Sequence, residues 1–169
     1  MARFNEAPMS QSRLTDFLDS YSIKYVAFTH SPAYTAQGIA ALAHIPGKEL
    51  AKTVIVKIDG TLAMAVVPAS RQVDLERLRA AAAAQFVEIA HEDEFRRFFP
   101  DCETGAMPPF GNLYGMSVYV DEELSRDREI VFNAGTHREL VRMSWADYDM
   151  LLHPKIMKVA TGTTISTAA

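Results

Sequence analysis

The sequence predicts a mixed α/β fold of the α+β type, in which helices pack on a sheet that has both parallel and antiparallel strands. Segments with a helical spacing of apolar residues alternate along the chain with short β-rich runs. Two of these runs, residues 51–57 and 61–68, are separated only by the turn Ile58-Asp59-Gly60. They therefore form an antiparallel hairpin within an otherwise interleaved chain.

The first elements are expected to be a helix, a strand and a second helix. Residues 11–21 have the spacing of an amphipathic helix, with apolar side chains at Leu14, Phe17, Leu18 and Tyr21. A β-rich run follows at residues 25–29, and the prolyl bond in His30-Ser31-Pro32 ends it. Thr35 can cap a helix over residues 36–44, before Pro46-Gly47.

After the hairpin, helices and strands continue to alternate. The run of alanines favours a helix over residues 74–84, and Pro100 ends another over residues 91–99. Ser144 can cap a last helix that ends near His153-Pro154. The strands expected in this half are residues 86–89, 117–120, 130–133 and 138–143.

Length, charge and cysteine usage restrict the class of protein. A chain of 169 residues is most simply one domain, which we place at residues 1–159 with a flexible tail at 160–169. The net charge of −4 argues against a protein that coats duplex nucleic acid, but it allows one that grips only a nucleic-acid end. One cysteine, no membrane-length apolar stretch and no signal-peptide core at the N-terminus together favour a cytoplasmic protein without membrane contact.

The common catalytic motifs are missing from the sequence. It contains neither a G-x-S-x-G elbow nor a G-x-x-x-x-G-K-[ST] phosphate loop. The five histidines lack the spacing of zinc ligands, so we expect neither a metal nor a cofactor. Cys102 is a candidate thiolate nucleophile, although a lone cysteine is more often an inert apolar residue.

The most distinctive segment runs from Gly105 to Asn112, Gly-Ala-Met-Pro-Pro-Phe-Gly-Asn. Proline fixes φ, and glycine allows conformations and close approaches that other residues forbid. Such a segment can be a structural turn between two elements. It can equally be the rigid wall of a pocket whose backbone N–H groups face a ligand.

Two further places carry candidate functional residues. Lys52 shares a strand face with Val54 and Val56, so its side chain either reaches solvent at the end of the sheet or projects into a cleft. Asn133-Ala134-Gly135-Thr136-His137 follows another strand. It is either a polar turn, with Gly135 at positive φ and Asn133 bonded to the backbone, or the lip of a pocket.

Four segments in this order resemble the YbaK / prolyl-tRNA synthetase-associated domain family. They are Leu50-Ala51-Lys52-Thr53-Val54, Val67-Pro68-Ala69-Ser70, Gly105-Ala106-Met107-Pro108-Pro109-Phe110-Gly111 and Phe132-Asn133-Ala134-Gly135-Thr136-His137. The similarity extends from about Leu14 to Pro154. It implies a mixed, partly barrel-like sheet with surrounding helices. It also implies a trans-acting hydrolase that cleaves the ester between a wrong amino acid and the 3′-terminal adenosine of a tRNA.

The resemblance also implies roles for individual residues. Lys52 matches the family's functional lysine, and Gly105 and Pro109 match its G-x-x-x-P loop, so Lys52 and the backbone at Gly105 are the implied catalytic groups. His137 matches a histidine that lines the amino-acid pocket in some members. The further substrate-binding residues that the resemblance implies are Ser70, Met107, Pro108, Phe110, Gly111 and Asn133.

The implied substrate is a tRNA acceptor end that carries a small amino acid such as alanine, serine or cysteine. Met107, Pro108 and Phe110 are bulky and stiff, and we expect them to exclude larger side chains. A synthetase is a second candidate partner. Two other functions stay open: a non-catalytic module of the same fold that binds a tRNA end, a nucleotide or a synthetase, and an unrelated hydrolase that uses Cys102.

Overall fold

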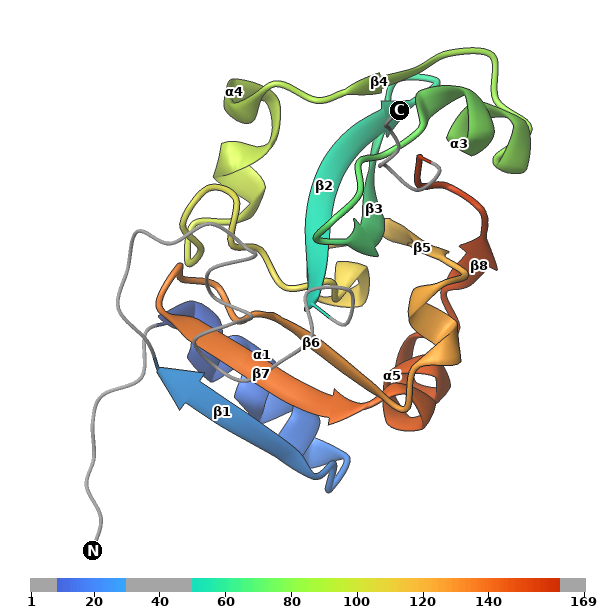
Figure 1. Ribbon diagram of the computed structural model, residues 1–169. Coiled ribbons are helices and arrows are strands. Elements are labelled where there is room, and N and C mark those ends of the chain that lie inside the picture. The colour runs from blue at the N-terminus through green and yellow to red at the C-terminus, as the bar shows by residue number, and fades with distance from the viewer. Residues whose placement is uncertain (1–8, 30–49, 162–169) are drawn as a thin grey trace, which may run out of the picture.

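The computed structural model describes residues 9–29 and 50–161 of the chain, and within them it has an eight-stranded mixed sheet with helices around it (Figure 1). The mixed α/β prediction is confirmed. The helix predicted over residues 36–44 lies outside the described residues.

The sheet contains both kinds of strand pairing. The hairpin is formed by β2 (Leu50–Ile58) and β3 (Thr61–Pro68), which are antiparallel as predicted. In the sheet order β1-β7-β6-β2-β3-β5-β8, the pairs β6–β2, β3–β5 and β5–β8 are parallel. The remaining strands on this path are β1 (Tyr25–Thr29), β5 (Ser117–Asp121), β6 (Glu129–Asn133), β7 (Glu139–Ser144) and β8 (Lys155–Met157).

The sheet is strongly bent, as expected for a partly barrel-like arrangement. In Figure 1, β1, β7 and β6 run across the lower part of the molecule, whereas β2 and β3 run almost upright. The short strand β4 (Val87–Ile89) lies off the main path and pairs with the last part of β2. The sequence did not predict β8, whose three residues are too few to give a periodic pattern.

The helices begin where polar residues can cap them. Asp74 caps α3 (Leu75–Ala81) by accepting the N–H groups of Glu76 and Arg77, and Ser144 caps α5 (Trp145–Leu152) as predicted. Helix α3 is shorter than the predicted 74–84, since Ala83 takes a left-handed φ of 54° despite the helix propensity of alanine. The other helices are α1 (Met9–Ser20) and α4 (Glu92–Phe95), which a 3₁₀ turn over Arg96–Phe98 extends.

Two apolar layers pack on opposite faces of the central strands. The larger contains Ala51 and Ile55 of β2, together with residues of α1 and α5. The smaller layer packs Val54 and Val56 of the same strand with Leu78 of α3. Odd and even positions of β2 therefore face opposite layers, which confirms that Lys52 shares a face with Val54 and Val56.

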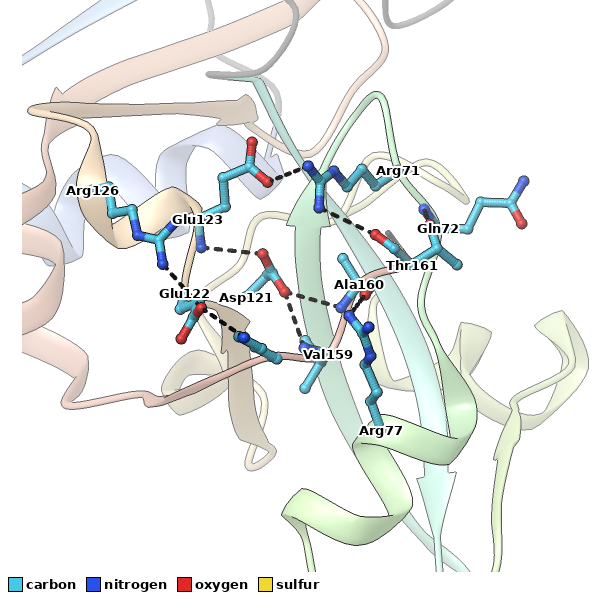
Figure 2. A network of polar contacts seen from close by, with 11 residues as sticks. Arg71, Gln72, Arg77, Asp121, Glu122, Glu123, Arg126, Val159, Ala160 and Thr161 are labelled. Atoms are coloured by element: carbon cyan, nitrogen blue, oxygen red, sulfur yellow. Dashed lines mark hydrogen bonds and ion pairs between the residues drawn. The ribbon is translucent and has the colours of Figure 1, made fainter. Parts of the chain in front are cut away.

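The C-terminal end of the described chain is held by a polar network at the edge of this second layer (Figure 2). The Asp121 carboxylate, only 4% exposed, accepts the backbone N–H groups of Val159 and Ala160 at 3.0 and 2.9 Å. Arg77 donates to the Ala160 carbonyl, and Arg71 donates to the carbonyl of Thr161. Ala160 and Thr161, which we expected to begin a flexible tail, are thus bonded to the body of the protein.

Replacing Asp121 is expected to destabilise the protein. In Asp121→Ala the buried N–H groups of Val159 and Ala160 lose their acceptor, and an unsatisfied buried donor costs about 1–3 kcal/mol. We therefore expect the free energy of unfolding in urea to fall by about 3 kcal/mol. The exposed Asp93 of α4 provides a matched control, and an equally small effect of Asp93→Ala and Asp121→Ala would contradict this account.

Candidate functional site

Two segments far apart in the sequence are joined by backbone hydrogen bonds. The first is the turn that follows β6, and the second is the loop at Glu103–Ala106. The Glu103 N–H donates to the Gly135 carbonyl at 2.8 Å, and the Gly135 N–H donates to the Ala106 carbonyl at 2.8 Å. We call this pair of segments, Glu103–Ala106 and Asn133–His137, the loop junction.

The turn after β6 has the local structure that its sequence predicts. Gly135 has a φ of 103°, which favours glycine, and the Asn133 side chain donates through Nδ2 to the Thr136 carbonyl at 3.3 Å. This confirms the turn interpretation of the segment. The turn also places His137 against the other half of the loop junction, so the same segment supplies a candidate functional side chain.

His137 lies over Gly105. A Cβ atom built on Gly105 would be 3.4 Å from Cε1 of the imidazole, and Gly105 itself has a φ of 88°. The Nε2 atom of His137 lies 2.8 Å from the carbonyl oxygen of Thr104. Because a carbonyl only accepts, Nε2 carries the hydrogen, which leaves Nδ1 as the unprotonated nitrogen of the neutral ring.

The loop at Gly105 presents backbone donors. Within the described part of the chain, the N–H groups of Gly105 and Met107 have no acceptor, whereas that of Ala106 donates to the Glu103 carbonyl. Met107 is only 4% exposed, and a buried N–H without an acceptor is rare in native proteins. Among the described residues, these two amides are therefore donors without a partner.

The side chains that follow Gly105 anchor the loop from inside. Met107 and Phe110 are buried in the larger apolar layer, and the Phe110 ring packs edge-on against Phe132 and Tyr148. The Tyr148 hydroxyl donates to the Pro109 carbonyl at 2.6 Å. Met107, Pro108, Pro109 and Phe110 are all buried. Between Gly105 and Gly111, the exposed part of the loop is therefore the backbone at Gly105.

Gly111 is needed for close packing. A Cβ atom there would lie 2.2 Å from the backbone oxygen of Met116 and 2.6 Å from a methyl group of Val118. No side chain fits at this distance unless the backbone moves. The structure thus gives Gly111 a packing role at the end of the loop.

Lys52 lies where one edge of β2 loses its neighbours. Strand β3 occupies one edge of β2 along its length. On the other edge, β6 pairs only with Leu50 and Ala51 among the described residues, and β4 pairs from Val56 onward. On that edge, residues 52–54 therefore pair with no described strand, although they pair with β3 on the first edge. Such openings beside the carboxyl end of a parallel strand are common positions for ligands.

The register places Lys52 beside the loop junction. Ala51 is opposite Phe132 in the parallel pair, so Lys52 and Asn133 are the next residues along the two strands. Both fall on the face of the Leu50 and Val131 pair. Asn133 begins the turn that is bonded to Glu103 and Ala106, so the lysine and the Gly105 loop are connected through a single turn.

The ammonium group of Lys52 is half-buried and unpaired. No ion-pair or hydrogen-bond partner for it exists among residues 9–29 and 50–161, and burial alone lowers the pKa of Lys52. By contrast, Lys57 on the opposite face of β2 pairs with Glu94 at 2.6 Å. A buried cation without a counter-charge is costly for folding and suggests a ligand that supplies the charge.

Ser70 is exposed in the turn after β3. Its neighbour Ala69 donates to the Leu50 carbonyl at 2.7 Å, which ties this turn to the start of β2 two residues before Lys52. Ser70 thus belongs to the same end of the sheet as Lys52 and Asn133.

Cys102 is not a favourable nucleophile. Burial raises the pKa of its thiol to about 11, and its sulfur lies 3.4 Å from the Tyr114 hydroxyl. The thiolate is the reactive form, so Cys102 stays protonated at neutral pH. It lines a cavity of about 540 Å³ together with Arg13, Asp101 and three residues of the loop junction, Glu103, Gly135 and Thr136.

Sequence analysis did not single out Glu103. Its carboxylate oxygen Oε1 accepts the backbone N–H of His137 at 2.7 Å, so the residue contributes both its backbone and its side chain to the loop junction. The only signal in the sequence is its position two residues before Gly105, which does not distinguish it from any exposed acidic residue.

Comparison with protein-family models assigns the chain to a family. The model of the aminoacyl-tRNA editing domain matches residues 30–151, which is most of the chain. The chain belongs to the aminoacyl-tRNA editing domain family. The sequence resemblance to the YbaK family is thereby confirmed.

Solved structures with the same fold cover nearly the whole editing domain. A protein described as a candidate trans-editing enzyme for prolyl tRNA synthetase is 21% identical, with a TM-score of 0.78 over 94% of this chain and 100% of that chain. A hypothetical protein is 18% identical, with a TM-score of 0.79 over 88% of this chain and 99% of that chain. At these identities the likeness shows the fold alone.

A third structure is much longer than this chain. It is a protein of Marinobacter aquaeolei VT8 described as a candidate signal transduction protein, 16% identical with a TM-score of 0.70. The match covers 92% of this chain but 31% of that one. No curated protein matches the sequence.

Two further findings concern metals and membranes. In the described ranges, no three histidine, cysteine or acidic side chains are grouped so that they could hold a metal ion. The helices of this part of the editing domain are also too short or too polar to cross a lipid bilayer.

Gly111→Ala is expected to destabilise the protein far more than Gly115→Ala. The new methyl group at position 111 collides with the backbone at Met116, so the loss should be about 3 kcal/mol or more. Gly115 has a φ of 71° and open space around it, so alanine there costs only about 1–2 kcal/mol of backbone strain. Urea unfolding of both variants measures the difference, and equal losses would contradict the packing role.

Cys102 is expected to react slowly with iodoacetamide at neutral pH. Its burial and raised pKa of about 11 mean that the alkylation rate should keep rising up to that pH in the folded protein. Mass spectrometry after timed labelling checks this, with the protein unfolded in urea as the control. A labelling rate that levels off near pH 8 would show an ordinary exposed thiol instead.

Proposed function

We propose that this editing domain is a trans-acting aminoacyl-tRNA deacylase, which hydrolyses the ester between a small amino acid and the 3′-terminal adenosine of a mischarged tRNA. The single observation that supports it best is the half-buried Lys52 beside the loop junction, which has no partner among the residues that the structure describes. In a member of the editing family, a cation held in this way fits a nucleotide end that brings its own negative charge.

The proposed reaction is attack of water on the ester carbonyl carbon. The carbonyl oxygen gains negative charge as the tetrahedral intermediate forms, and the N–H groups of Gly105 and Met107 are proposed to stabilise it. Removing one such donor typically raises the barrier by about 3–4 kcal/mol. The intermediate collapses when the bond to the 3′ oxygen breaks and that oxygen takes a proton.

Lys52 is proposed to bind the terminal nucleotide rather than to act as a base. Its ammonium group can contact a phosphate or ribose oxygen, and partial burial strengthens this contact because the local dielectric constant is lower than that of water. Asn133, one register step away on β6, can contribute a hydrogen bond through its Oδ1 atom, since its contact with Thr136 uses Nδ2. Holding the ester still then contributes to the rate through proximity.

Water activation requires little from the protein, because an aminoacyl ester is already reactive. The vicinal ribose hydroxyl of the tRNA is one group that can orient and deprotonate the water. The unprotonated Nδ1 of His137 is another. We propose that His137 mainly shapes the pocket around the amino acid.

Selection of a small amino acid is proposed to come from the stiffness of the Gly105 loop. Met107, Pro108 and Phe110 are buried, so they support the pocket wall from behind. A wall that cannot retreat excludes larger side chains, whereas an apolar pocket alone separates substrates by only about 1–3 kcal/mol per methylene. Alanine, serine and cysteine are the proposed substrates.

The direct test is a deacylation assay over a panel of mischarged tRNAs. Because one structural neighbour is described as a candidate trans-editing enzyme for prolyl tRNA synthetase, tRNA for proline that carries alanine, serine or cysteine comes first. We expect turnover of at least one of these esters and none of prolyl-tRNA. Binding of tRNA without any turnover would overturn the proposal in favour of a non-catalytic module.

Lys52→Met is expected to abolish most of the activity without loss of stability. Methionine keeps the apolar stem and removes an unpaired charge whose burial opposes folding, so the melting temperature should stay the same or rise. The value of kcat/KM for deacylation should fall by about 100-fold, since truncating one partner of a buried charge pair costs about 2–5 kcal/mol of binding free energy. Calorimetry and initial-rate measurements check the two halves of this prediction.

Lys57→Met is the matched control, since this lysine lies on the same strand but faces the opposite side. It should lose its ion pair with Glu94 and keep its activity. Comparable activity in the Lys52 and Lys57 variants would contradict the role assigned to Lys52.

A further inference from the structure

The position of His137 depends on a single acidic residue outside the motif. Glu103 accepts the backbone N–H of His137 at 2.7 Å through its side chain, and it donates its own N–H to Gly135 at 2.8 Å. One residue therefore holds the turn after β6 at two points. Both contacts are made across more than thirty residues of sequence.

These contacts also determine which nitrogen of the His137 ring carries the hydrogen. With the His137 backbone fixed, the ring reaches the Thr104 carbonyl through Nε2 at 2.8 Å and lies against Gly105. The hydrogen is then held on Nε2, and the lone pair on Nδ1 is left for a water molecule or for the substrate. If the backbone were released, the exposed ring could rotate, and either tautomer could form.

The Glu103 contact is poorly explained by stability alone. His137 and Glu103 are both exposed, and water could satisfy the His137 N–H if the carboxylate were removed. An exposed hydrogen bond of this kind adds little to the free energy of folding. What the carboxylate adds is a fixed position for the turn relative to Gly105.

We propose that Glu103 is a positioning residue, which holds His137 over Gly105 in one orientation and one tautomer. Its carboxylate does not touch the substrate. This inference rests on the proposed deacylase function for its kinetic consequence but not for its structural one.

Three variants distinguish a positioning role of Glu103 from an effect of its charge and from an effect on folding. Glu103→Gln keeps an oxygen that can accept the His137 N–H, whereas Glu103→Ala removes the acceptor. Glu76→Ala, on the exposed surface of α3, removes the same charge at a site that has no contact with the loop junction. All three should have melting temperatures close to that of the unchanged protein.

The structural readout is the ¹⁵N chemical shifts of the His137 ring, assigned by comparison with His137→Gln. The unchanged protein and Glu103→Gln should show the Nε2–H tautomer, and Glu103→Ala should show a mixture of the two tautomers. An unaltered tautomer in Glu103→Ala would overturn the proposal. So would an unfolded Glu103→Ala, because the contact would then be structural.

The kinetic readout is the deacylation rate at saturating and at low substrate. Glu103→Ala should lower kcat by about tenfold with little change in KM, because the pocket wall formed by His137 would no longer hold the ester in its reactive position, and Glu103→Gln should retain most of the rate. If Gln and Ala are equally impaired, the carboxylate acts by charge and the proposal fails. If the unchanged protein deacylates no tRNA, the proposed function fails, and the ring shifts alone decide the role of Glu103.

Discussion

The hydrogen bonds between Gly135 and the loop at Glu103 and Ala106 are the constraint on which the candidate site depends. Strand pairing brings Lys52 to the turn after β6, but no strand of the described sheet contains Gly105. Among the described residues, the backbone hydrogen bonds that relate the two are those of the loop junction. Because Gly105 takes a φ that favours glycine, and because the neighbouring prolines restrict the backbone, the loop can meet the turn without much further loss of entropy.

Two groups of the candidate site lower the free energy of unfolding of the ligand-free protein. Lys52 is half-buried without a counter-charge, and the Met107 N–H is buried without an acceptor in the described chain. Each is unfavourable in the free protein, and each is complementary to a group that an aminoacyl-adenosine end carries. The surrounding core offsets this cost, since Phe110, Phe132 and Tyr148 hold the loop from behind.

Much of this arrangement could be predicted from the sequence, and the rest could not, for identifiable reasons. The hairpin, the Ser144 cap and the Gly135 turn follow from local rules, and the four matching segments are enough to indicate the family. Burial of Met107 and Phe110 was not predicted, because a loop sequence has no periodicity that assigns its side chains to a face. The role of Glu103 depends on contacts across more than thirty residues, which no local pattern contains. The order at Ala160 arises in the same way, from the distant carboxylate of Asp121.

The central claim is that Lys52 and the amides at Gly105 and Met107 act on the same ligand. It is tested most directly by a crystal structure of the protein with a non-hydrolysable 3′-aminoacyl-adenosine analogue. The account predicts that the Lys52 ammonium contacts a phosphate or ribose oxygen, while the carbonyl mimic accepts hydrogen bonds from Gly105 and Met107. An analogue bound with its carbonyl group turned away from these amides, or with Lys52 still uncontacted, would contradict it.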